Sequence, residues 1–263
     1  MCIALSLFTP HRPSLPRSLK FQIASTGLLL LAIGSSMQAQ SIDVPNGSFE
    51  SPTPPAGYPA TPQVDVWQKS TQPVWFDPAT TGGITWNQLS GVFPNPPAGD
   101  SKSIDNVNGQ QAAYLFALPR VGLLQSSLDA IFVVGHSYSL TVGLLGGGGI
   151  PDGATFSIGL FFLDGADKLV SVGSTTATFS AANFPTVTHL IDYQLNIPEV
   201  KSTDAYAGHH IGVELLSTSG TGAGYWDVDN IRLTAVPEPS TLVLASTGLG
   251  GLLILTQRAR RRA

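Results

Sequence analysis

Carboxylates are the most abundant chemically active side chains in the central part of this 263-residue chain. Residues 40–236 hold 13 Asp, 3 Glu and 6 basic residues, a net charge of −10, whereas the whole chain carries −4. Such an acidic surface disfavours nucleic acid, which needs a basic footprint, and it also disfavours anionic polymers and lipids. Carboxylate and carbonyl oxygens are the ligands of Ca²⁺, so a calcium site is compatible with this composition, although turns and solvated faces account for most of the Asp residues.

Three tryptophans, Trp67, Trp75 and Trp86, are candidate ligand-binding residues, because an exposed aromatic ring can stack on the face of a sugar. Side chains that could hydrogen-bond a sugar lie close to them in sequence, at Asp77, Asn87 and Gln88. The alternative is that these rings belong to the core, where aromatic side chains are most often found.

Catalytic signatures are missing from the sequence. It contains neither Gly-x-Ser-x-Gly nor His-Glu-x-x-His. Carboxylate pairs for glycoside hydrolysis are recognised by their separation in space, and an Asp-rich chain contains accidental pairs. His189 occupies an apolar position of an alternating segment, so we expect a hydrogen-bonded core residue there. These observations favour a protein that is not an enzyme.

Apolar residues recur at every second position in several segments, which is the pattern of half-buried strands. The clearest segments are 137–144, 155–162, 187–197 and 211–215, with Gly and Pro turns between them. No amphipathic helix of ten or more residues is apparent from 40 to 235. This pattern predicts an all-β fold, a β-sandwich of jelly-roll type, over residues 40–235.

The last strand of this region, 225–234, does not keep one alternation. Trp226 and Val228 share one face, whereas Ile231 and Leu233 have the opposite parity. All four side chains favour the core, so we expect a bulge near Asp229 that redirects its side chain.

The stretches 46–50 (Asn-Gly-Ser-Phe-Glu) and 227–231 (Asp-Val-Asp-Asn-Ile) resemble the opening and closing strands of galactose-binding-like jelly rolls, the fold of many carbohydrate-binding modules. The resemblance implies that the two stretches lie side by side and hold a structural Ca²⁺ through Glu50 and Asp229, away from the sugar site. Asn230 stands where such modules often have a second Asp. The alternative is that Glu50 and Asp229 only accept hydrogen bonds from backbone N–H groups.

The segment 236–263 has three features in a fixed order. It holds Pro237-Glu238-Pro239, then 16 residues without charge at 241–256, then four arginines at Arg258, Arg260, Arg261 and Arg262. As a helix, the uncharged part would span about 24 Å, slightly less than a ~30 Å hydrocarbon core, and the arginines favour a cytoplasmic end. This order resembles the PEP-CTERM sorting signal, which implies a transmembrane helix removed by an exosortase-like enzyme. A permanent tail anchor and a buried terminal helix are the alternatives.

Residues 1–39 resemble a secretory signal peptide, because basic residues precede the apolar segment 21–34 and Ala39 supplies a small residue at the cleavage point. We expect signal peptidase to cleave there, and an uncleaved transmembrane anchor is the alternative. The single cysteine, Cys2, would be lost, so the exported domain would be stabilised by core burial or by a metal.

These features predict an exported protein that is held transiently in the inner membrane and then lies at the cell surface or in the extracellular matrix. PEP-CTERM sorting is associated with exopolysaccharide and biofilm, so the expected role is carbohydrate or exopolysaccharide binding. The alternatives are a purely structural matrix component without a specific ligand and a polysaccharide-active enzyme.

Overall fold

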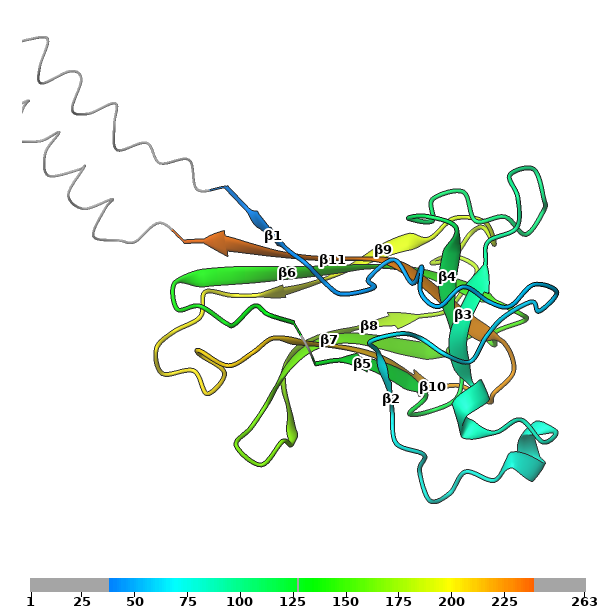
Figure 1. Ribbon diagram of the computed structural model, residues 1–263, viewed down its shortest axis with the longest axis horizontal. Helices are drawn as coiled ribbons and strands as arrows, with labels where there is room; N and C mark the ends of the chain where they lie inside the picture. The colour runs from blue at the N-terminus through cyan, green and yellow to red at the C-terminus, as the bar shows by residue number, and fades with distance from the viewer. Residues whose placement is uncertain (1–37, 127, 239–263) are drawn as a thin grey trace, which may run out of the picture. The chain divides into compact units, whose positions relative to one another are not determined.

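Two antiparallel β-sheets face each other in the computed structural model, which describes residues 38–126 and 128–238 (Figure 1). The first sheet, sheet A, has the order β3-β4-β11-β6-β9, and β1 also pairs with β11. Its strands are β1 (Gln40–Ile42), β3 (Ser90–Pro94), β4 (Gln111–Phe116), β6 (His136–Gly147), β9 (Ile191–Ile197) and β11 (Tyr225–Pro237).

The second sheet, sheet B, has the order β2-β5-β10-β7-β8. Its strands are β2 (Gln68–Lys69), β5 (Gly122–Gln125), β7 (Thr155–Leu163), β8 (Leu169–Thr178) and β10 (Gly212–Ser219). Two short 3₁₀ helices, η2 (Pro78–Thr81) and η3 (Trp86–Gln88), precede β3. The all-β two-sheet sandwich expected from the alternation is therefore confirmed.

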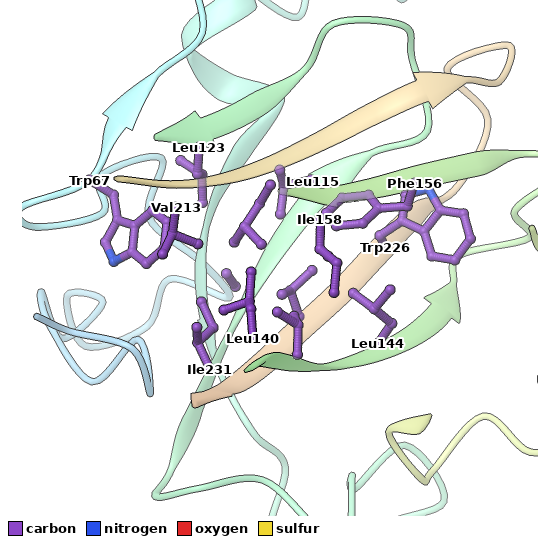
Figure 2. Close-up of a cluster of buried hydrophobic side chains, with 14 of the residues drawn as sticks. Trp67, Leu115, Leu123, Leu140, Leu144, Phe156, Ile158, Val213, Trp226 and Ile231 are labelled. Carbon is purple, nitrogen blue, oxygen red and sulfur yellow. The ribbon is translucent and has the colours of Figure 1, made fainter. Parts of the chain in front are cut away.

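The core lies between the two sheets and is built from the alternating positions of their strands. On β6, the apolar positions Tyr138, Leu140, Val142 and Leu144 are buried, while their neighbours face outward. Side chains of β7 and β10 from sheet B pack against those of β6 and β11 from sheet A, as the close-up shows for Leu144, Phe156, Val213 and Trp226 (Figure 2). Because successive residues of a strand point to opposite faces, the remaining side chains of each sheet point away from this core.

The bulge expected in the last strand is present. Along the β11–β6 pairing, Asp229 lies opposite Gly143 and Arg232 lies opposite Thr141, so one extra residue is accommodated between them. Asn230 adopts a left-handed backbone conformation with φ 57°, which Asn tolerates better than most residues. Trp226, Val228, Ile231 and Leu233 are all buried as a result.

The outer face of sheet A is partly covered by the long connection between β3 and β4. Ile104 from this connection packs against Leu145 of β6 and Leu190, and Phe93 and Val107 border the cluster. This second, smaller apolar cluster holds the connection against β6, and the N–H of Asn108 reaches the carboxylate of Asp229 on the neighbouring strand β11.

Some details of the strand assignment were wrong. The strand expected from residue 187 begins only at Ile191, and Val187 is 68% exposed. The sequence did not predict β8, whose residues are mainly small and polar. Within the described residues, no helix is long and apolar enough to cross a membrane. Residues 1–37 of the expected signal peptide 1–39 and the whole of the expected transmembrane helix 241–256 lie outside the described residues.

Candidate functional site

Strand β11 places two carboxylates on the outer face of sheet A. Asp227 and Asp229 alternate with Trp226 and Val228, whose side chains fill the core, so the two Asp side chains point the opposite way. Both are nonetheless buried, Asp227 to 6% exposure and Asp229 to 0%. Buried carboxyl groups are uncommon unless they are paired, so each requires an explanation.

Asp229 is held by the connection between β3 and β4. The backbone N–H of Asn108 donates to its Oδ2 at 2.6 Å, whereas its buried Oδ1 has no hydrogen-bond partner in the described part of the chain. Burial raises the pKa of Asp229 to about 7, and the negative charge of Glu50 acts in the same direction, against the hydrogen bonds from Asn108 and Asn230. The two candidate metal ligands of the sequence are therefore brought together.

Glu50 binds the same connection. Its Oε1 accepts hydrogen bonds from the backbone N–H groups of Gln110 at 2.8 Å and Gln111 at 2.9 Å. A side chain at Gly109, where φ is 116°, would collide with the Glu50 carboxylate, so this close approach requires glycine. The hydrogen bonds agree with the alternative role of Glu50 as an acceptor of backbone N–H groups.

The oxygen atoms around Glu50 and Asp229 suit a hard cation. Besides Asp229 Oδ1, the side-chain oxygen of Gln111 is buried without a hydrogen-bond partner among the described residues. Oxygen donors without nitrogen or sulfur are the ligand set of Ca²⁺. The described residues contain no group of three or more His, Cys, Asp or Glu that could hold a metal, so amide and backbone oxygens would have to complete the coordination.

The motif stretches 46–50 and 227–231 lie side by side, as the sequence resemblance implied. The N–H of Ile231 donates to the carbonyl of Gly47 at 3.0 Å. A Cβ added to Gly47 would lie 3.0 Å from the Val44 carbonyl and 3.3 Å from the Ile231 carbonyl, so the two segments approach closely at this glycine.

Asp227 lies on the same outer face of sheet A as Asp229, near the ring of Tyr225. Burial raises its pKa well above the usual range of an aspartate, and its Oδ1 has no partner among the described groups. A Cβ placed on Gly147 would lie 2.7 Å from Tyr225 Cε2 and 2.9 Å from Asp227 Oδ2. The ring and the carboxyl therefore both lie against this glycine.

The ring of Tyr225 forms one wall of a pocket of about 440 Å³ on the same face. We call this the aromatic pocket; its lining residues are Pro59, Ala60, Ile84, Gln88, Phe93, Tyr114, Phe116 and Tyr225. Phe116 lies between two of the other rings, with centroids 6.2 Å from Tyr114 and 6.1 Å from Tyr225. Desolvation raises the pKa of both tyrosines, so their hydroxyls stay protonated near neutral pH.

The three candidate tryptophans do not form a shared exposed platform. Trp67 and Trp86 are buried, and their indole N–H groups donate to the carbonyls of Asn46 and Ser70. Trp75 is 53% exposed and packs edge-on against Trp86, with ring centroids 6.4 Å apart. None of the three lines the aromatic pocket.

His189 is not the core residue that alternation predicted. It precedes β9, its side chain is half exposed, and its Nδ1 lies 2.6 Å from Asp105 Oδ1. The apolar cluster of Ile104 and Leu190 brings these two chain segments together and leaves the histidine at the surface.

Two residues of the sorting motif are described. Pro237 ends β11 opposite His136, and the N–H of Glu238 donates to the Gly135 carbonyl at 2.8 Å. The other sorting residues lie outside the described residues: Pro239, Arg258, Arg260, Arg261 and Arg262.

Sequence reasoning missed the aromatic pocket and assigned no role to Asp227. A signal was available, because Trp226 and Val228 on one face imply Tyr225, Asp227 and Asp229 on the other. Two acids and a tyrosine on one face of a strand that pairs on both sides are unusual, and this could have identified the site.

The chain also matches a known protein family. The HpiC1-like family, described as HpiC1 cyclase, matches residues 40–234. A search of curated proteins finds no match.

Several solved cyclases share the fold. A cyclase from Fischerella sp. TAU is 21% identical, with a TM-score of 0.58 over 77% of this chain and 100% of that one. The Stig cyclase Fisc from the same organism, in complex with (3Z)-3-(1-methyl-2-pyrrolidinylidene)-3H-indole, matches at 21% identity, the same coverage and a TM-score of 0.56. A cyclase complex with 4-(1H-indol-3-yl)butan-2-one also matches at 21%, over 76% of this chain and 100% of that one, with a TM-score of 0.56. At this identity the likeness shows the fold.

Proposed function

Because the chain belongs to the HpiC1-like family, we propose that the aromatic pocket binds a small molecule and that Asp227 is the proton donor of a cyclisation reaction. The observation that carries this proposal is the proximity of Asp227 to Tyr225, whose ring lines the pocket, since both side chains lie against Gly147. The sequence alone favoured a protein that is not an enzyme. Membership of a family described as a cyclase supports an enzymatic role instead.

The chemistry follows from a buried carboxyl group whose pKa is raised by desolvation, which favours its protonated form. Such an acid can protonate an electron-rich carbon or a carbonyl oxygen of a bound molecule. A π bond of the same molecule then attacks the resulting cation, and one carbon–carbon bond forms. Loss of a proton from the product cation to the Asp227 carboxylate restores the acid, so the reaction is an isomerisation without an oxidant or a second reactant.

The pocket walls suit a cationic intermediate. The faces of Phe116 and Tyr225 stabilise positive charge through their ring quadrupoles. Asp227 itself does not line the pocket, and the Tyr225 ring packs against Gly147 and Gly148 near it. The proposal therefore requires the Tyr225 ring to turn when a ligand binds, so that the carboxyl reaches the ligand.

The substrate class we propose is an indole that carries an unsaturated side chain. Two solved cyclases of this fold are described in complex with indole-containing molecules. An aromatic ring system matches the ring-lined walls, and an unsaturated side chain supplies the π bond for ring closure.

Turnover of such indoles tests the proposal. Purified full-length protein is incubated with indoles bearing alkenyl side chains, and products of unchanged mass are resolved by chromatography. We expect conversion by the wild type, loss of conversion in Asp227→Asn, and retention in Trp75→Ala, whose side chain lies outside the pocket. Conversion that persists in Asp227→Asn contradicts the role of this acid.

Carbohydrate or exopolysaccharide binding is the second candidate, favoured by the ring faces of Tyr114, Phe116 and Tyr225 beside the amide of Gln88. A glycan array separates the two: binding that Phe116→Ala removes favours a sugar site, and the absence of binding to any glycan leaves the cyclase or a purely structural matrix role. Release of reducing ends would instead indicate a polysaccharide-active enzyme.

We further propose that Glu50 and Asp229 hold a structural Ca²⁺, supported by the two buried oxygens that lack hydrogen-bond partners among the described residues.

We also propose that the protein is exported with cleavage by signal peptidase, is held transiently in the inner membrane and is processed by an exosortase-like enzyme. This proposal rests on the sequence of residues 1–39 and 236–263. The destination proposed is the cell surface or the extracellular matrix.

A further inference from the structure

The end of β11 is fixed to the loop that precedes β6. Glu238 donates its backbone N–H to the Gly135 carbonyl at 2.8 Å, and its Oε1 accepts a hydrogen bond from Ser137 Oγ at 2.7 Å. Pro237 lies opposite His136 in the sheet. The chain therefore leaves the described domain directly beside residues 131–135.

That loop is held by hydrogen bonds and ring packing, and it presents aliphatic side chains outward. Phe132 is buried, and its ring packs edge-on against Tyr138 at a centroid distance of 5.3 Å. The Tyr138 hydroxyl accepts from Val133 N–H at 2.7 Å and donates to the Ile131 carbonyl at 3.0 Å. With the backbone held in this way, three side chains remain 39–50% exposed: Ile131, Val133 and Val134.

Both ends of the described domain lie at this end of sheet A. Gln40 of β1 pairs with Ala235 of β11, and the two strands are seen side by side in Figure 1. After Glu238 the sequence has only Pro239 and Ser240 before the 16 uncharged residues 241–256. Two extended residues span at most about 7 Å, so whatever receives that segment also approaches residues 131–135.

We propose that this end of the sandwich docks on a lipid bilayer, with Ile131, Val133 and Val134 in the interface while residues 241–256 occupy the hydrocarbon core. The short tether and the exposed aliphatic side chains point to the same partner. Residues 199–201 adjoin this loop, because the N–H of Gly135 donates to the Val200 carbonyl. The opposite charges of Glu199 and Lys201 stand beside each other there. Apolar burial rather than headgroup charge therefore provides the contact with the bilayer.

Site-specific fluorescence in vesicles tests the docking. The full chain with Cys2→Ser receives one cysteine at a time, as Val134→Cys, Leu249→Cys or Val187→Cys, and each is labelled with an environment-sensitive dye. Val187 is the matched control, because it is an exposed valine that precedes β9 at the end where Ile191 pairs with Leu144, away from His136. The vesicles contain phosphatidylethanolamine, phosphatidylglycerol and a nitroxide-labelled lipid.

We expect the lipid nitroxide to quench the dye at positions 249 and 134 and to leave the dye at 187 unquenched. If the dye at 249 is quenched but the dye at 134 is quenched no more than the dye at 187, the proposal is overturned. Ile131, Val133 and Val134 would then be a surface for a protein partner. An unquenched dye at 249 would overturn it as well, because the tether would then not be in the bilayer. Circular dichroism of each variant checks that the sandwich is folded.

Discussion

The carboxyl of Asp227 and the phenol ring of Tyr225 both lie against Gly147 on the outer face of sheet A. Tyr225 thus lines the aromatic pocket, while Asp227, two positions along the strand, is a buried acid. Strand geometry explains the pairing, since residues i and i+2 share a face. The glycine opposite makes room for both groups.

Substitution of that glycine should disturb both groups. In Gly147→Ala the added methyl would lie within 3 Å of Tyr225 and Asp227, and such overpacking typically costs about 1–3 kcal/mol of unfolding free energy. We also expect weaker ligand binding in the aromatic pocket. Chemical denaturation measures the first effect, with Gly165→Ala as control because its added methyl meets no atom within 4 Å. Equal stability of the two variants would contradict the described packing.

Chelation should destabilise the protein if Glu50 and Asp229 hold Ca²⁺. We expect a chelator to lower the Tm of the wild type and added Ca²⁺ to restore it, because a cation bound only to the folded state stabilises that state. Glu50→Ala should abolish the response, and Glu199→Ala, which removes an exposed glutamate, should retain it. A wild-type Tm that does not respond to the chelator would rule out the metal.

The pH dependence of stability should carry the signature of Asp229. Burial raises its pKa from 3.8 to about 7, so between these values the folded protein keeps a proton that the unfolded chain has released. The free energy of unfolding should therefore fall as pH rises from about 4 to about 7, by up to about 1.4 kcal/mol per pH unit. The measurement is denaturant unfolding in chelator across this range.

Asp229→Asn should make that profile flatter, whereas the exposed Asp152→Asn should leave it unchanged. Asp227 contributes in the same direction, because burial raises its pKa too, so only the difference between wild type and variant reports Asp229. Added Ca²⁺ should also flatten the wild-type profile, since a cation favours the ionised carboxylate. A profile that is identical in Asp229→Asn would contradict the raised pKa.

The tryptophans should separate into stabilising and dispensable residues. Trp86 is buried and its indole donates to Ser70, so Trp86→Ala should cost about 3–5 kcal/mol of unfolding free energy. Trp75 is half exposed, so Trp75→Ala should cost much less. Thermal and denaturant unfolding of the two variants check this order, and a larger loss in Trp75→Ala would contradict it.

Much of the fold could be predicted from local pattern. Period-2 alternation identified β6, β7 and β10, because each strand has one buried face. The parity change between Val228 and Ile231 predicted the bulge in β11 from the sequence of one strand. The proximity of Glu50 and Asp229 came from a motif resemblance, which supplied a long-range contact that alternation cannot provide.

The missed features depend on long-range packing. Residues 70–111 have no periodicity, so nothing local indicated that Trp86 is buried while Trp75 is exposed. His189 fits the alternation of β9 by sequence, but β9 begins only at Ile191. The side chain of His189 instead pairs with Asp105 at the surface. The aromatic pocket combines residues of β3, β4 and β11, so it exists only after the sheet has formed.

The proposed cyclisation requires the aromatic pocket to bind a small aromatic molecule near Asp227. The most direct measurement is NMR of tyrosine-labelled protein during titration with 4-(1H-indol-3-yl)butan-2-one, with assignment by Tyr114→Phe and Tyr225→Phe. We predict shifts of the Tyr114 and Tyr225 signals and none for Tyr138 and Tyr206, which pack around Phe132. Unshifted Tyr114 and Tyr225 signals at a saturating probe concentration would contradict the account.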